Sequence, residues 1–167
     1  MEIIISDNEL KQAASAGCDE FLQAIAGAMR TAVGGDELTA EVMRQLNASQ
    51  VTLWGYLIFR DEVMDGGFVQ LIYNGYGPFF FDNPFAKAMR LWGLHDFSKL
   101  IYKAKKVYDV RKEELTCERT DEEFMALFEQ FPEFDDLDDE FVEEEEHITE
   151  SIARYVDENL PLFVQVK

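Results

Sequence analysis

The side chains with the clearest chemical potential in this chain are carboxylates, and they crowd into its last third. Fifteen Asp and Glu stand between Thr120 and Ala153, a stretch without a single Lys or Arg. Carboxylates at this density can coordinate a metal ion, transfer protons as a catalytic pair, or bind a cationic surface. The spacing of the acids decides among these chemistries.

One segment of the acidic stretch superficially resembles a calcium-binding loop. Asp136, Asp138 and Glu140 alternate as the first ligands of such a loop do. However, Phe141 occupies the position that requires glycine for a sharp turn, and His147 occupies the position of the final bidentate glutamate. We therefore expect weak cation association here and no specific calcium site.

A second pattern resembles part of a di-iron site. Glu144 and His147 match one half of the paired helical motif that binds two iron ions. The other half is missing, because Trp92 stands three residues before His95, where a glutamate would be needed. Neither of the two cysteines has a base close to it in the sequence, so no activated nucleophile is indicated. These patterns predict no metal, no cofactor and no enzymatic activity.

The acids instead follow the spacing of an amphipathic helix expected over residues 137–159. At about 100° per residue, one face of this helix gathers apolar side chains that would be buried. These are Leu137, Phe141, Ile148, Ile152 and Tyr155. The opposite face carries a row of carboxylates roughly 4.5–6 Å apart along the axis. The row consists of Asp139, Glu143, Glu146 and Glu150.

The density of these carboxylates approaches that of a nucleic acid. Nine acids fall within the twelve residues 135–146, which gives one negative charge per ~2 Å of helix against ~1.7 Å along duplex DNA. A solvated face that serves only solubility is the alternative, although such faces usually mix both signs of charge. The predicted partner-binding residues are Asp135, Asp136, Asp138, Asp139, Glu140, Glu143, Glu146 and Glu150.

The charge of the whole chain indicates which partners this surface would meet. The 167 residues carry a net charge of −19, and −16 of it lies within residues 109–167. Phosphates would be repelled, so a basic protein surface is favoured over direct contact with nucleic acid. No signal peptide or apolar stretch of about 20 residues is visible, and no membrane contact is expected. We predict a cytoplasmic protein whose two cysteines are reduced thiols in or near the core.

Turn and capping signals predict a single all-α domain. Helix starts are expected at the capping residues Ser6, Asp36, Ser49, Asp82, Asp96 and Thr120, of which Ser6 with Glu9 and Thr120 with Glu123 form capping-box patterns. The expected helices span about residues 7–33, 37–47, 51–64, 68–73, 85–93, 97–115, 121–131 and 137–159. Residues 76–81 are expected to form a loop, and residues 2–5 and 162–166 to pair as two short strands.

A polar and glycine-rich cluster separates two of these helices. Gly66 and Gly67 are expected to make a tight break, since glycine adopts conformations closed to other residues. Gln70 and Asn74 would then satisfy backbone groups exposed at the break. A cluster of this composition is alternatively a binding site, but the structural interpretation is the stronger of the two.

This cluster also carries a resemblance to a known family. Residues 62–75 read EVMDGGFVQLIYNG, which resembles the signature of the DNA-mimic-protein-19-like domain: a glutamate, Asn/Asp-Gly-Gly-Phe, then a glutamine and an asparagine at fixed spacing. Further similar segments follow at residues 85–93, 137–141 and 152–156. The resemblance spans roughly residues 50–160.

The resemblance implies a bacterial, acidic, helical protein that imitates the charge surface of duplex DNA. Such a protein would occupy the DNA-binding face of a helix-turn-helix transcription factor and block its access to DNA. A DNA-binding regulator with two-fold symmetry would match a mimic with two-fold symmetry, so a homodimer of this protein is a further expectation.

Two other functions remain open from the residues themselves. An immunity-type inhibitor of a basic nuclease toxin would carry the same kind of acidic surface, and only the identity of the partner separates the two. A carboxylate metal enzyme is the less favoured alternative, which tight and stoichiometric metal in the purified protein would support.

Overall fold

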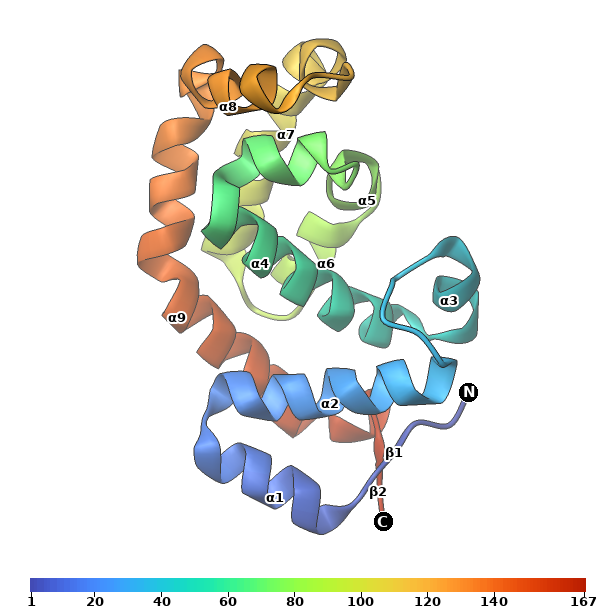
Figure 1. Ribbon diagram of the computed structural model, residues 1–167. Coiled ribbons are helices and arrows are strands. Elements are labelled where there is room, and N and C mark those ends of the chain that lie inside the picture. Colours follow the sequence, from blue (N-terminus) through green and yellow to red (C-terminus); the bar gives the residue numbers. More distant parts are fainter. The chain divides into compact units, whose positions relative to one another are not determined.

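The computed structural model describes the backbone of residues 1–167 and every side chain except that of Phe128. Its described residues are almost entirely helical, as predicted (Figure 1). The helices are α1 (Asp7–Ala16), α2 (Cys18–Val33), α3 (Ala40–Gln45), α4 (Ala48–Tyr73), α5 (Gly77–Phe81), α6 (Phe85–Leu91), α7 (His95–Thr116), α8 (Asp121–Gln130) and α9 (Asp135–Glu158). Single 3₁₀ turns, η1 (Pro132–Phe134) and η2 (Leu160–Leu162), flank α9, and the strands are β1 (Ile4–Ile5) and β2 (Gln165–Val166).

The chain divides into two compact units. The first comprises Met1–Leu57 and Glu146–Lys167, and the second comprises Ile58–Glu145. The divisions fall inside α4 and inside α9, so each of these helices contributes residues to both units. The expectation of a single domain stays a prediction.

The first unit is closed by contacts between the two ends of the chain. β1 and β2 pair in parallel, with Ile4 opposite Gln165 and Ile5 opposite Val166, which confirms the predicted terminal strands. The side-chain amide of Gln50 donates to the carbonyl of Phe163 at 2.9 Å, so the start of α4 holds the segment that leads into β2.

Several predicted boundaries in this unit were wrong. The helix expected over residues 7–33 is two helices, α1 and α2, because the chain breaks at Gly17 with φ at 154°. Thr39, and not Asp36, caps α3 by accepting from the backbone of Val42. The start of α4 is capped by Asn47 instead of Ser49, through reciprocal 2.9 Å hydrogen bonds with Gln50.

The second unit is built around an aromatic core centred on Phe59. Five rings lie with centroids 5.1–6.0 Å from that of Phe59. They belong to Phe68, Phe80, Phe85, Phe97 and Phe141. These rings come from α4, α5, α6, α7 and α9, so a single cluster fixes the acidic helix against its neighbours.

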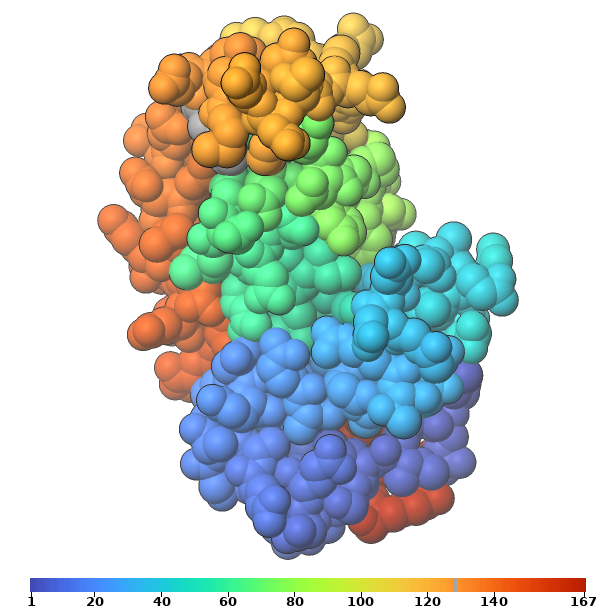
Figure 2. All heavy atoms as spheres, viewed as in Figure 1, coloured from blue at the N-terminus to red at the C-terminus, as the bar shows by residue number. Residues whose placement is uncertain are grey.

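The remaining elements of the second unit follow the sequence signals in part. Asp82 and Asp96 were wrongly predicted as caps, because α6 begins after Pro84 and α7 begins after Leu94, and neither start has a side-chain capping hydrogen bond. The predicted capping box of α8 is present, since Thr120 and Glu123 bond each other's backbone N–H at 3.2 and 2.8 Å. Residues 77–81, expected to be a loop, form the short helix α5, whose start is compatible with Pro78. In Figure 2 the side chains of α8 lie against the second half of α4, where the rings of Tyr73 and Phe124 are 4.4 Å apart.

No helix among the described residues is long and apolar enough to cross a membrane.

Candidate functional site

The acidic helix α9 begins at Asp135, two residues earlier than predicted, directly after the turn η1. The face predicted to be apolar is the one that packs inward: Phe141, Ile148 and Ile152 are buried, and Leu137 and Tyr155 are half-buried. The helical periodicity therefore places most of the carboxylates of α9 on the outside. The eight acids predicted to bind a partner nevertheless have different surroundings.

Four of these eight acids are open. Asp135, Asp136, Asp139 and Glu146 are exposed, lie outside a groove lined by lysines, and have no nitrogen of a described Lys, Arg or His side chain within 4.0 Å. Three of the four stand on the first turns of α9, in the second unit. Asp135 and Asp139 are one turn apart, with a rise of about 6 Å between them. These three open acids of α9, Asp135, Asp136 and Asp139, form an exposed surface without a short ion pair.

Asp138 serves the fold instead of the surface. Its Oδ1 accepts a hydrogen bond of 2.8 Å from the backbone N–H of Phe68, the first residue after the break in α4. Gly67 adopts φ 71° and ψ −173°, a backbone conformation essentially restricted to glycine. Asp138 therefore caps the second half of α4 from α9, across 70 residues of sequence.

Burial changes the proton affinity of this carboxyl group. Removal from water raises the pKa of Asp138 from 3.8 to about 6, the hydrogen bond from Phe68 opposes this rise, and the nearby charges of Asp135 and Asp139 add to it. The folded protein therefore binds this proton more tightly than the unfolded chain does. The contribution of Asp138 to the free energy of unfolding is fully present below about pH 4 and is lost as the pH rises through about 6.

Replacement of Asp138 by asparagine is expected to remove this pH dependence. The asparagine keeps an oxygen that accepts from Phe68 but carries no charge, so Asp138→Asn should stabilise the protein at pH 7 by about 1 kcal/mol, after allowance for solvent screening. Urea unfolding of both proteins between pH 4 and 7 measures the difference. The exposed neighbour Asp136→Asn is the control, and a constant difference between Asp138→Asn and the parent protein at every pH would refute the assignment.

Two more of the predicted acids face lysines. Glu140 and Glu143, together with Glu144, line a groove of about 260 Å³ in the second unit. The opposite wall of this groove belongs to α7 and carries Asp96, Lys99 and Lys103. The last of the eight, Glu150, pairs with Arg154 at 3.3 Å, an exposed i, i+4 contact that is worth little in water.

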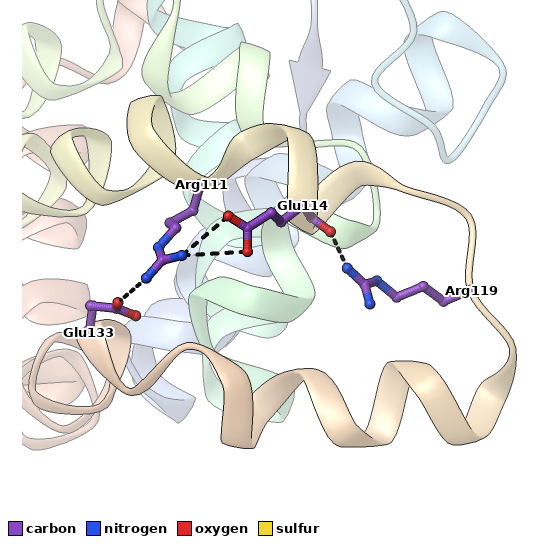
Figure 3. Close-up of polar contacts among 4 residues, drawn as sticks. All are labelled: Arg111, Glu114, Arg119 and Glu133. Carbon is purple, nitrogen blue, oxygen red and sulfur yellow. Dashed lines mark hydrogen bonds and ion pairs between the residues drawn. The ribbon is translucent and has the colours of Figure 1, made fainter.

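The basic residues just before the acidic stretch are also engaged (Figure 3). Arg111 bonds the carboxylate of Glu133 at 2.8 Å and that of Glu114 at 3.2 Å. Arg119 donates to the carbonyl oxygen of Glu114. A hydrogen bond from its own backbone, together with the Arg111 guanidinium, lowers the pKa of Glu133. Arg111 thus compensates Glu114 and Glu133, and it leaves other acids of the region unpaired.

Sequence reasoning left those other acids out of the site. The end of α7, the following loop and α8 carry exposed carboxylates without a described cation within 4.0 Å. They are Glu113, Glu118, Asp121, Glu122 and Glu129. The stretch without bases from residue 121 to residue 152 includes the acids of α8, but their position relative to α9 depends on helix packing, which the sequence alone does not give.

The glycine-containing cluster of α4 is a structural element. Gly66 and Gly67 break the helix as predicted. Gln70 and Asn74, expected to bond exposed backbone, instead donate to the same carboxylate oxygen of Glu62, at 2.8 and 2.9 Å. A ladder of side-chain hydrogen bonds therefore bridges the break from one half of α4 to the other.

The described part of the chain shows no arrangement of side chains suited to binding a metal ion, and its cysteines are not where they were predicted. Among those residues, no group of three or more His, Cys, Asp and Glu side chains is arranged to hold a metal ion. Both cysteines, Cys18 and Cys117, are free and exposed, so their predicted location in or near the core was wrong.

The comparison with known proteins agrees with the resemblance seen in the sequence. The family model described as DMP19-like protein matches residues 44–159. The chain is also 32% identical over 137 residues to the DNA mimic protein DMP19 of Neisseria meningitidis serogroup B (strain ATCC BAA-335 / MC58), and the alignment covers 81% of each chain. The Glu62–Asn74 ladder and the break at Gly66 and Gly67 lie within the matched region. The chain belongs to the family of DMP19-like proteins.

Proposed function

We propose that this protein is a cytoplasmic, non-enzymatic DNA mimic that binds the DNA-binding face of a helix-turn-helix transcription factor. The observation that carries the proposal is the open surface of α9, where Asp135, Asp136 and Asp139 have no compensating cation within 4.0 Å among the described side chains. The relative of this chain named a DNA mimic protein supports the same function.

The number of open acids per length of α9 is closer to the charge density of a single DNA strand than to that of the duplex. Asp135, Asp136, Asp139 and Glu146 are four open charges in twelve residues, or one per ~4.5 Å of helix. A single DNA strand carries one charge per ~3.4 Å, and the duplex one per ~1.7 Å. A mimic of the duplex therefore needs a second set of carboxylates, and the unpaired acids of α8 and of the segment before it are candidates for that set.

The proposed mechanism is competitive occlusion. A helix-turn-helix protein holds the DNA backbone with Arg and Lys side chains that fix its register on the duplex. Carboxylates bind the same cations through charge-assisted hydrogen bonds, in bidentate form for arginine. Binding should weaken with salt, but less steeply than DNA binding, because a protein surface releases fewer condensed counterions.

A pull-down from bacterial lysate tests this proposal. The purified protein is immobilised, bound proteins are eluted with a salt gradient, and mass spectrometry identifies them. Recovery of a helix-turn-helix regulator at moderate salt, which its own operator duplex also displaces, is the expected result. Recovery of a basic nuclease instead would identify the protein as an immunity-type inhibitor. Recovery of no basic protein would indicate that the acids serve only to keep the protein soluble.

A further inference from the structure

The groove between α7 and α9 places two ammonium groups beside the acidic helix. Lys99 and Lys103 are one turn apart on α7, both are exposed, and they share the groove with Glu140, Glu143 and Glu144. Neither lysine has a carboxylate of the described side chains within 4.0 Å. The lysines therefore form no short ion pair with a single carboxylate. Their positive charge instead attracts all three glutamates of the opposite wall.

Helix geometry places Glu140 and Glu144, but not Glu143, to one side of the open acids. Measured from Asp135 at about 100° per residue, Asp139 lies at about 40° and Asp136 at about 100°. Glu140 lies at about 140° and Glu144 at about 180°, beyond the open acids, whereas Glu143, at about 80°, lies between Asp139 and Asp136. The lysines thus share the groove with Glu140 and Glu144 at one edge of the acidic face of α9, and Asp135 and Asp139 lie at the opposite edge.

We propose that Lys99 and Lys103 are specificity-determining residues, which neutralise one side of the acidic face and confine a cationic partner to Asp135, Asp136 and Asp139. The proposal deepens the proposed function and rests on it. An arginine that approaches Glu140 or Glu144 meets the two ammonium groups that share the groove with these acids, and exposed charges act on one another over about 8 Å at physiological ionic strength. An arginine that approaches Asp135 approaches a carboxylate outside this groove. The lysines therefore select the register in which a row of partner cations can bind α9.

Two triple variants that remove the same charge from the same helix test this division. Asp135→Asn, Asp136→Asn and Asp139→Asn form the open-side variant, and Glu140→Gln, Glu143→Gln and Glu144→Gln form the groove-side variant. The probe is a fluorescent octa-arginine peptide, with binding to the full chain followed by anisotropy. The open-side variant should lose about tenfold or more in affinity, and the groove-side variant about twofold.

A double-mutant cycle then tests the lysines themselves. The double variant Lys99→Gln with Lys103→Gln should bind the peptide several-fold more tightly than the parent protein. When the groove-side substitutions are added to this double variant, they should reduce the affinity as much as the open-side substitutions do. The matched control is Lys87→Gln with Lys106→Gln, which changes the net charge equally at exposed lysines outside the groove. Equal losses in the two triple variants, or equal gains in the two lysine variants, would overturn the inference.

Carboxylate footprinting of the unmutated protein tests the division without any variant. Carbodiimide labelling, read by mass spectrometry with and without the peptide, should show protection of Asp135, Asp136 and Asp139 and little change at Glu140 and Glu144. Uniform protection along the helix would contradict the inference. The octa-arginine result does not depend on DNA mimicry, whereas failure to displace an operator duplex would refute the proposed function and leave this division of charge standing.

Discussion

Replacing Asp135, Asp136 and Asp139 by lysine is expected to abolish binding of the transcription factor while the helices stay intact. The three side chains are exposed, and no hydrogen bond or ion pair within the described structure depends on them. The change converts three attractive contacts into three repulsive ones, and like charges juxtaposed at an interface cost several kcal/mol. A loss of about a thousandfold or more in affinity follows, measurable by calorimetry with the regulator recovered in the pull-down.

A matched reversal in the first unit separates local contacts from net charge. Glu20, Asp36 and Glu37 are exposed and have no described cation within 4.0 Å, so their replacement by lysine changes the net charge equally. This control should lose only the modest share of affinity that long-range attraction supplies. Circular dichroism checks that both variants are folded. Retained binding by a folded variant with lysine at 135, 136 and 139 would remove these residues from the interface.

The Gly67→Ala substitution is expected to destabilise the protein by about 3 kcal/mol or more. Its backbone conformation is strained for any residue with a side chain. The new Cβ would also lie 2.8 Å from Cγ of Asp138, the residue that caps the second half of α4. The substitution thus forces apart the contact that joins α9 to the break in α4. Urea unfolding measures the loss of free energy.

The same substitution at Gly27 provides the control. Gly27 lies inside α2, and a Cβ built there meets nothing within 4 Å. Gly27→Ala should therefore stabilise the protein by about 0.5–1 kcal/mol, through the higher helix propensity of alanine. If Gly67→Ala proves as harmless as Gly27→Ala, the break and its cap contribute little to stability.

Local signals in the sequence predicted much of the fold. The capping box of Thr120 and Glu123 and the glycine pair at the break in α4 act over a few residues, so their spacing predicts them directly. Gly17 was missed because a single glycine inside an amphipathic pattern is compatible with an uninterrupted helix. The start of α4 was misplaced because Asn47 and Ser49 are both good capping residues, and Gln50 decides between them by bonding Asn47 in return.

The candidate site was predictable only to the level of a helix face. Periodicity correctly separated the buried side of α9 from its acids. It could not show that Asp138 caps a backbone N–H 70 residues away in sequence. Nor could it place Lys99 and Lys103 beside Glu140 and Glu144, because that proximity arises from the packing of α7 and α9 in the second unit.

A competition experiment tests DNA mimicry most directly. The helix-turn-helix regulator is bound to its labelled operator duplex, and the protein is added at increasing concentration while anisotropy reports the fraction of DNA bound. The account predicts complete release of the duplex, with no complex that contains regulator, duplex and this protein together. Release should require Asp135, Asp136 and Asp139. A stable ternary complex, or an operator that stays bound at saturating protein, would contradict the claim that this acidic surface takes the place of DNA.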